Sequence, residues 1–205
     1  MSIAFPTSNT ANRNPHFNPS TYVRQRLNTF EMEPTTIEQL EEYFFLLMGS
    51  YLDISEHLPT LRRLASVCDT VVELGTRCGN STFAMIMGVP EKVISVDIED
   101  NPVATRIEAA ADIMDVRYEF IKGDSRTVKL PRKFDMLFVD SEHTFEQVSA
   151  ELLAHKNSVT KYIVFHDTES NPDIIRAIWR ELDSDFELVE NYVTCNGLWV
   201  MKRSN

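Results

Sequence analysis

The stretch Thr70-Val-Val-Glu-Leu-Gly-Thr-Arg-Cys-Gly-Asn-Ser-Thr82, followed by Val93-Ile-Ser-Val-Asp97, decides the fold class of this chain. The first segment predicts a buried strand, a Gly-x-x-x-Gly turn and a helix that opens on polar capping residues. The second predicts another apolar strand, which ends on a carboxylate. Together they predict a nucleotide-like cofactor at the carboxyl edge of a parallel sheet, and they favour an enzyme over a binding module.

The residues of the turn each have a physical reason. Gly75 allows a sharp turn where a Cβ would clash, and Gly79 allows the backbone to approach a ligand closely. Ser81 and its neighbours can cap the following helix, whose free N–H groups then face the ligand. Asp97 lies 18 residues after Gly79, where a carboxylate can accept hydrogen bonds from both hydroxyls of a ribose.

The spacing differs from the dinucleotide fingerprint Gly-x-Gly-x-x-Gly, because Thr76 and Arg77 replace the middle glycine. Glu73 lies two residues before Gly75, and Glu-x-Gly-x-x-x-Gly resembles motif I of the class I S-adenosylmethionine (SAM) methyltransferases. The ligand of that family has no phosphate but carries an amino-acid end, and a carboxylate suits its ammonium and sulfonium groups. An ordinary βα turn in another α/β protein is the alternative for this motif alone.

The composition of the whole chain bounds its function class. Its 205 residues suit one α/β domain with a modest extension, and 43% hydrophobic residues suffice for a sizeable core. A net charge of −11 argues against nucleic acid and against anionic membranes as partners, because both are bound by clustered lysine and arginine. We therefore expect a small-molecule acceptor.

The three cysteines indicate the cellular compartment. They share no metal-binding spacing, and we expect them to be reduced and mostly buried. The sequence shows neither a secretory h-region nor an apolar run long enough to span a bilayer. These features predict a cytoplasmic protein.

The chain divides into an arm and one domain. Residues 1–33 are rich in Asn, Pro, Ser and Thr and predict a flexible N-terminal arm, whose scattered aromatics leave open a role in folding over a substrate or a partner subunit. Residues 34–68 predict two leading helices, of which the first has an apolar run, 43–47, that would suit a homodimer. Residues 69–205 predict a Rossmann-like core.

Strand and helix patterns alternate within this core. Strands are predicted near 70–74, 93–97, 116–121, 134–140 and 161–165, with helices near 81–88, 102–114, 143–156 and 172–182. This alternation predicts an α/β fold, a mostly parallel sheet with helices on both faces. Residues 186–192 and 197–202 then predict a closing antiparallel hairpin, which is the arrangement of the class I methyltransferases.

Two apolar strands deliver acidic and imidazole side chains at their ends. Asp140 and His143 follow one of them, and His166 and Asp167 end the next. If these strands are neighbours in the sheet, their ends lie about 4.8 Å apart, and the four side chains converge beside the cofactor pocket. Carboxylates in a small cleft need a cation, a shared proton or a donor. Mg²⁺ would serve, since carboxylate oxygens, waters and substrate oxygens satisfy it.

The same region carries a second resemblance. The small-molecule O-methyltransferases of the type 24 group are similar to this chain in Val139-Asp-Ser-Glu-His-Thr-Phe-Glu-Gln-Val-Ser-Ala-Glu-Leu152, Val164-Phe-His-Asp-Thr168 and Asn171-Pro-Asp-Ile-Ile-Arg-Ala-Ile-Trp-Arg-Glu-Leu182. The cephalosporin-hydroxylase-like methyltransferases of antibiotic pathways share the Asp-Ser-x-His and x-Asp-Thr signatures. The similarity runs from about residue 68 to 202.

This resemblance implies positions for the parts of SAM. It places the methionine end at Glu73, Gly75, Gly79 and Ser81, the ribose at Asp97, and the adenine at Asp124 with Ser125 beside it, and it puts Asp140 at the cofactor edge. For Asp124, the cap of a turn is the alternative.

The resemblance also implies catalytic roles. Asp140 and Asp167 match positions that bind Mg²⁺ in metal-dependent members, and His143 or His166 would be the acid–base group. His166 stands where some of those members carry a second acid, so the sequence leaves the metal open. His143 has a second interpretation, as part of the capping region of the helix that follows. His57 and His155 have no motif around them and are predicted at the surface.

These observations predict a SAM-dependent methyltransferase that acts on an oxygen of a small hydroxylated molecule. The acceptor hydroxyl would lose its proton to a histidine, or to solvent with the help of Mg²⁺. A SAM-binding sensor or partner subunit without transferase activity is the first alternative. An NAD-dependent oxidoreductase is the second, and the glycine spacing and the closing hairpin disfavour it.

Overall fold

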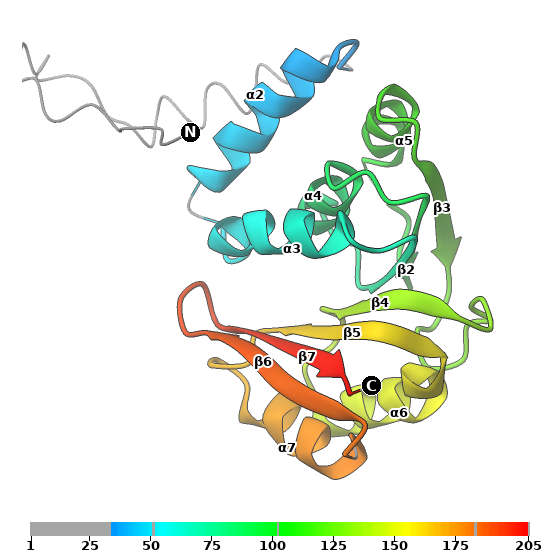
Figure 1. The fold of residues 1–205 in the computed structure, drawn as a ribbon, viewed down its shortest axis with the longest axis vertical. Coiled ribbons are helices and arrows are strands. Elements are labelled where there is room, and N and C mark those ends of the chain that lie inside the picture. The colour runs from blue at the N-terminus through cyan, green and yellow to red at the C-terminus, as the bar shows by residue number, and fades with distance from the viewer. Residues whose placement is uncertain (1–33, 51, 102, 183, 205) are drawn as a thin grey trace, which may run out of the picture.

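A computed structural model describes residues 34–50, 52–101, 103–182 and 184–204 of the chain, shown in Figure 1. The arm predicted for residues 1–33 lies outside the described residues. The leading segment contains α2 (Ile37–Met48), the 3-10 helix η1 (Ser55–His57) and α3 (Leu58–Ala65). The strands are β1 (Thr70–Leu74), β2 (Lys92–Asp97), β3 (Arg117–Lys122), β4 (Phe134–Val139), β5 (Val159–His166), β6 (Phe186–Tyr192) and β7 (Leu198–Arg203). The remaining helices are α4 (Asn80–Ile86), α5 (Ala104–Ile113), α6 (Phe145–His155), η2 (Lys156–Ser158) and α7 (Pro172–Glu181).

The seven strands form one sheet with the order β3-β2-β1-β4-β5-β7-β6. Strands β1 to β5 pair in parallel, whereas β7 is antiparallel to both β5 and β6. The Rossmann-like α/β fold and its closing hairpin are therefore confirmed. The last strand inserts between β5 and β6 because β7 is largely buried, while β6 has a mostly exposed pattern that suits the sheet edge.

Helices cover both faces of the sheet (Figure 1). One core cluster joins α2, α3, α4 and α5 to the sheet and includes Leu61, Phe83 and Val71. The other joins α6 and α7 to the opposite face and includes Leu152 and Val72. Successive strand residues point to opposite faces, which is why the neighbours Val71 and Val72 belong to different clusters. Each face of the sheet thus has its own apolar core under a layer of helices.

The leading segment differs from the prediction in two details. The second predicted helix begins as η1 and continues as α3, and Pro59 lies in the first turn of α3, where a missing N–H costs nothing. Helix α2 buries most of its apolar run against the same chain and leaves Phe45 exposed. Much of the apolar surface that suggested a homodimer is thus already covered, and the dimer stays a prediction.

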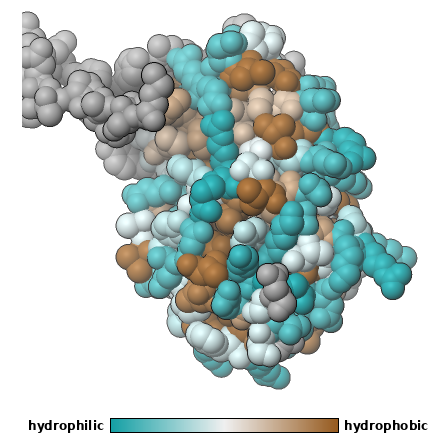
Figure 2. Space-filling model, viewed as in Figure 1, coloured by the Kyte–Doolittle hydropathy of each residue, from teal (hydrophilic) through white to brown (hydrophobic). Residues whose placement is uncertain are grey.

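The surface of the described residues corrects two further expectations. A tryptophan on a helix that packs against a sheet is usually expected in the core, but Trp179 is 67% exposed, because the buried positions of α7 are Ile174, Ala177 and Ile178. Cys78 is exposed in the glycine turn rather than buried. Figure 2 shows hydrophilic side chains dividing the apolar surface of the viewed face into separate patches. Within the described part of the chain, helices are too short or too polar to cross a bilayer.

Candidate cofactor and catalytic site

Three strands meet at the glycine turn after β1. The Gly75 amide donates a hydrogen bond to the Val96 carbonyl at 2.8 Å, and the Asp140 amide donates to the Leu74 carbonyl at 2.9 Å. Gly75 has φ of +92°, and a Cβ on it would lie 2.2 Å from the Asp140 carbonyl oxygen. Only glycine therefore permits this approach of the β4 end to the turn.

Gly79 is required at its position by backbone conformation and by packing. Its φ is +71°, and it precedes α4 as a left-handed capping residue. A Cβ on Gly79 would lie 3.0 Å from Val103 Cγ2 and 3.1 Å from Ile107 Cδ1. The missing side chain thus makes room for α5 and its leading residue, and the approach of Gly79 to a ligand stays a prediction.

Asp97 holds the turn through its carboxylate. Its Oδ2 accepts hydrogen bonds from the amides of Thr76 at 2.8 Å and Arg77 at 3.0 Å, and its Oδ1 accepts one from the Glu99 amide at 3.0 Å. Burial alone would raise the pKa of Asp97, but these amide donors outweigh it and lower the pKa. The carboxylate stays charged at the end of β2 and retains lone-pair capacity toward the cavity.

Glu73 lies beneath the turn and lines neither of the two cavities described below. Its carboxylate accepts hydrogen bonds from the hydroxyls of Ser81 and Thr82 at 2.5 Å and of Ser95 at 2.6 Å. Burial raises its pKa to about 7, although the three hydroxyls oppose the change. Glu73 therefore ties β1 to α4 and β2, and it reaches the site only through Ser81.

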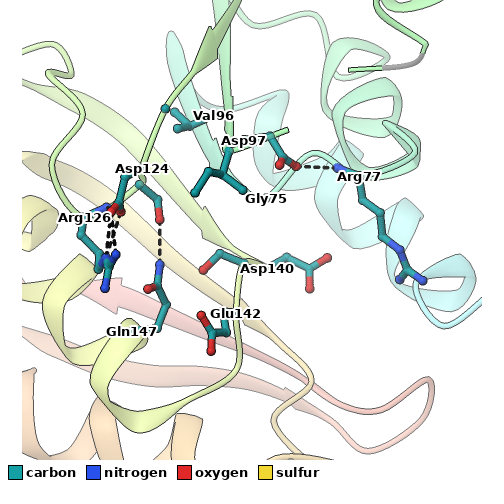
Figure 3. Close-up of a pocket in the computed structure, with 13 residues that line it drawn as sticks. Gly75, Arg77, Val96, Asp97, Asp124, Arg126, Asp140, Glu142 and Gln147 are labelled. Atoms are coloured by element: carbon teal, nitrogen blue, oxygen red, sulfur yellow. Dashed lines mark hydrogen bonds and ion pairs between the residues drawn. The ribbon is translucent and has the colours of Figure 1, made fainter. Parts of the chain in front are cut away.

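A first cavity of about 290 Å³ opens at the ends of β1 and β2 and continues along the loops after β3 and β4 (Figure 3). Val96 and Ile98 form an apolar wall beside Asp97, and Ile98 is 69% exposed. Gly123 lies on the opposite loop, and a Cβ there would meet nothing within 4 Å. An acid next to an apolar wall with free space above it fits a nucleoside, which combines hydroxyl donors with a flat base.

Asp124 and Ser125, predicted to lie beside the adenine, both line this first cavity. The Asp124 carboxylate binds the Arg126 guanidinium and accepts from the Arg126 amide at 2.9 Å. The Arg126 guanidinium holds the pKa of Asp124 at about 2. Asp124 therefore also caps the turn, which was the alternative considered for it. Ser125 is buried, and its hydroxyl donates inward to Glu151 at 2.5 Å.

A second cavity, of about 380 Å³, lies between the leading segment and the glycine turn. Leu52 and Ile54 give it apolar walls, and Asp53 and Ser81 give it polar ones. Arg77 and Asp140 line both cavities, so the two adjoin at these side chains. A ligand that fills the first cavity would reach the second beside Asp140.

The four predicted side chains at the ends of β4 and β5 converge, as expected. His166 Nδ1 lies 3.1 Å from both Asp140 Oδ1 and Asp167 Oδ2. His143 Nε2 lies 3.1 Å from Asp167 Oδ2 and 3.4 Å from Asp140 Oδ1. Two carboxylates and two imidazoles thus form one compact group beside the second cavity.

His166 is the fixed cation of this group. It is 2% exposed, and its Nε2 lies 3.1 Å from the carbonyl oxygens of Asp53 and Cys195, which can only accept. Burial alone would lower the pKa of His166, but hydrogen bonds to Asp140 and Asp167 outweigh it and raise the pKa to about 10. Both ring nitrogens therefore carry protons at neutral pH, and His166 is unsuited to accept another.

His143 differs from His166 in exposure and in bonding. Its side chain is 30% exposed, and Thr144 rather than His143 caps α6, with its hydroxyl accepting from the Gln147 amide. The contact with Asp140 raises the pKa of His143, burial opposes the change, and the charge of Asp167 adds to it. His143 is thus the more exposed of the two imidazoles, and the carboxylates beside it favour its protonated form.

The donor set tests whether Mg²⁺ fits. Asp140, His166 and Asp167 offer ligand atoms within 4.8 Å of one another. Mg²⁺ prefers oxygen ligands, whereas the central donor here is an imidazole nitrogen that bears a proton between the two carboxylates. The His166 cation already balances the carboxylates, so these residues do not fit a Mg²⁺ site.

Three buried polar residues near the site escaped the sequence prediction. His57 and His155 were expected at the surface, but both are buried, and Glu151 is fully buried beside Ser125. His57 Nε2 donates to the carbonyls of Thr194 at 3.0 Å and Cys195 at 3.2 Å, next to His166. Burial lowers the pKa of His57, so this histidine is neutral, unlike His166.

The sheet order, the closing hairpin and the glycine turn with its acid at the end of β2 together define the class I methyltransferase fold. Residues 72–168 of the chain match a family model described as a methyltransferase domain. The match includes the turn, Asp97 and both acidic strand ends. This part of the chain is therefore similar to a methyltransferase domain, in agreement with the fold.

Solved structures share the fold at low sequence identity. The O-methyltransferase from Bacillus cereus in complex with S-adenosylhomocysteine (SAH) is 16% identical, with 90% of this chain and 98% of that chain covered and a TM-score of 0.59. The SAH-bound methyltransferase PaMTH1 of Podospora anserina is 13% identical over the whole of both chains, with a TM-score of 0.61.

The N-methyltransferase NodS of Bradyrhizobium japonicum is also 13% identical, with 75% of this chain and 97% of that chain covered and a TM-score of 0.56. The fold thus occurs with both oxygen and nitrogen acceptors. A search among curated proteins finds no match to the sequence.

Proposed function

We propose that this protein transfers a methyl group from SAM to an oxygen atom of a small hydroxylated molecule. The observation that carries the proposal is the position of Asp140, which lines both cavities and lies 3.4 Å from His143. A methyl donor and a methyl acceptor must meet end to end, and the junction of the two cavities is where an acid and an acid–base group lie together.

The first cavity would hold the adenosine of SAM. Asp97 would accept from the ribose, the wall of Val96 and Ile98 would cover the base, and Asp124 and Ser125 would flank it. The methionine end would pass Asp140 into the second cavity near Ser81. The B. cereus O-methyltransferase and PaMTH1, which have this fold, both hold SAH, and this supports the assignment.

When bound, SAM supplies a methyl carbon on a sulfonium sulfur, and its transfer to an acceptor oxygen leaves the neutral sulfide SAH. Asp140 would accept a hydrogen bond from the acceptor hydroxyl and align it. His143 would take the hydroxyl proton, because the resulting imidazolium lies 3.1 Å from Asp167 Oδ2 and 3.4 Å from Asp140 Oδ1. The His166 cation would hold both carboxylates in place during the transfer.

The acceptor would be small and would react without Mg²⁺. The second cavity holds about 380 Å³ and would take both the methionine end of SAM and the acceptor, which leaves room for a small molecule only. Proton removal falls to His143, since His166 occupies the position between Asp140 and Asp167 that a cation would need. The assignment to oxygen follows the type 24 resemblance.

The test is transfer of labelled methyl from SAM to a panel of phenols, catechols and sugars, with matched amines, in buffer containing EDTA. The proposal expects labelled ethers from at least one hydroxylated class and none from the amines. Transfer to the amines alone contradicts the oxygen assignment. Binding of SAH without transfer to any panel member would favour a SAM-binding sensor.

Asp140→Asn provides the check on the proposed centre. The amide keeps the size of the side chain but removes the charge that aligns the hydroxyl and stabilises protonated His143. Turnover should fall at least about tenfold while SAH binding is retained. Unchanged turnover would place the chemistry elsewhere.

A further inference from the structure

Helix α6 carries a buried polar row next to its apolar face. Gln147, Glu151 and His155 are spaced four residues apart, so they lie on successive turns of the same side. All three are buried, and Glu151 is 0% exposed. Val148 and Leu152 beside them pack into the apolar core. A carboxylate in this position loses its hydration, which costs free energy. This cost indicates that Glu151 does more than fill space in the core.

Glu151 gathers three donors on one oxygen. Its Oε1 accepts from the hydroxyls of Ser125 and Ser141 at 2.5 Å and from the Gln147 amide at 2.9 Å. Ser125 lies in the loop after β3, and Ser141 directly follows Asp140 after β4. One carboxylate therefore ties two loops of the first cavity to the helix behind them.

Two residues of the row donate hydrogen bonds to Ser125, one to its hydroxyl and one to its backbone carbonyl. Gln147 Nε2 donates to the Ser125 hydroxyl at 2.9 Å, and Figure 3 shows the labelled Gln147 side chain with its dashed hydrogen bond beside the cavity. His155 Nε2 donates to the Ser125 carbonyl at 2.6 Å. Ser125, Ser141 and Gln147 all line the first cavity, while Glu151 stands behind them.

The two carboxylate oxygens of Glu151 differ in their hydrogen bonding. Its Oε2 is buried and has no hydrogen-bond partner among the described residues. Burial raises the pKa of Glu151, and the three donors oppose the change. An apolar side chain would fill this space without such a cost, which argues that the residue serves the loops rather than the core.

We propose that Glu151 is a positioning residue for cofactor binding, which holds the loops after β3 and β4 in the shape that receives the nucleoside. The inference rests on the proposed function, since it assigns adenosine to the first cavity. A wall that is already in place binds its ligand without the cost of ordering the loops. Glu151 itself does not touch the cofactor, and its effect passes through Ser125, Ser141 and Gln147.

The test compares Glu151→Ala with Glu151→Gln. The alanine variant should raise the Kd for SAH and the KM for SAM about tenfold, because two loops lose their shared acceptor, while kcat changes less than about threefold. The glutamine variant keeps one acceptor oxygen for the serine hydroxyls and should restore most of the affinity. Calorimetric titration of SAH and steady-state kinetics measure the two effects.

Leu152→Ala is the matched control, because it weakens packing of the same helix without touching the cavity. It should lower Tm and leave the Kd for SAH unchanged in the folded protein. Equal increases in Kd for the alanine variants of Glu151 and Leu152 would reduce Glu151 to a structural role and overturn the proposal.

If Glu151→Ala does not fold, Ser141→Ala provides a second test of the proposal. This variant removes one hydroxyl at the cavity edge and should raise the Kd for SAH about threefold. Wild-type affinity in Ser141→Ala and Ser125→Ala together would overturn the inference. Absence of SAH binding in the wild-type protein would instead refute the proposed function.

Discussion

The two halves of the sheet edge hold their carboxylates in different ways. Around β1 and β2, Glu73 and Asp97 accept hydrogen bonds from neutral hydroxyls and backbone amides. At the ends of β4 and β5, Asp140 and Asp167 face the imidazoles of His143 and His166. The first half is built from neutral dipoles, and the second depends on charge.

This difference matches the work proposed for each half. Neutral donors fix a shape without a mobile proton, which suits a surface that binds a nucleoside. Charged imidazoles can hold or exchange a proton, which suits the removal of one from a hydroxyl. The two halves should therefore respond differently to substitution and to pH.

The largest effect is expected in the neutral half, from Gly75→Ala. A Cβ would lie 2.2 Å from the Asp140 carbonyl oxygen at a φ of +92°, so β4 and the turn must separate. The free energy of unfolding should fall by about 4 kcal/mol, measured by denaturant titration. Gly123→Ala is the control on the same cavity, and it should change the free energy of unfolding by less than about 0.5 kcal/mol. Similar losses in both variants would show that the turn is not tightly packed.

In the charged half, His166→Gln should destabilise the protein by about 3 kcal/mol. The substitution leaves Asp140 and Asp167 close together without their buried cation. His57→Gln is the control, because neutral His57 holds the Cys195 carbonyl as His166 does but faces no carboxylate pair. The free energy of unfolding of His57→Gln should be lower than that of the wild type by about 1 kcal/mol. Equal losses of stability in the two variants would mean that His166 stabilises the protein through its hydrogen bonds to the carbonyls and not through its charge.

His143→Gln should separate chemistry from stability. We expect turnover to fall about a hundredfold, with the SAH affinity and Tm close to wild type, because His143 is partly exposed and lines neither cavity itself. In the wild type, kcat/KM should rise with pH through an ionisation above 6.5, since the base must lose its proton and Asp140 raises its pKa. The variant should lack this limb of the profile. A retained limb would assign the ionisation to another group.

A further effect is a pH-dependent one at Glu73. Its pKa is raised from 4.5 to about 7 in the folded protein, so the folded state binds an extra proton between these values. Stability contributed by protonated Glu73 is therefore lost as pH rises through this window. The Tm of wild type relative to Glu73→Gln should fall between about pH 5 and pH 7.5. The exposed Glu91→Gln serves as the control, and a parallel pH dependence in all three proteins would contradict a buried, shifted Glu73.

Local patterns were enough to predict most of the fold. Strand β1, its turn and Asp97 follow from apolar runs, glycines and a terminal acid that lie close together in the sequence. The convergence of Asp140 and Asp167 follows from the rule that neighbouring parallel strands end at one edge. The order of the hairpin strands did not follow, because it depends on which strand is more completely buried, and this is decided by the rest of the sheet.

The burial of single polar residues could not be predicted from the sequence. His57 and His155 gave no motif, since their burial depends on how η1 and α6 pack. A signal for Glu151 did exist, because Gln147, Glu151 and His155 form a row with helical spacing next to apolar positions. The charge of His166 could not be predicted, because it arises from two carboxylates and two carbonyls contributed by separate segments.

Calorimetric titration of SAH into the wild-type protein, in EDTA and then with added Mg²⁺, tests the central claim most directly. A preformed half whose β1 and β2 carboxylates are held by neutral donors, and a second half balanced by the His166 cation, predict one SAH per chain with micromolar affinity, equal in both buffers. Absence of binding by the folded protein would contradict the cofactor site. Binding that requires Mg²⁺ would contradict the role of His166 as the resident cation.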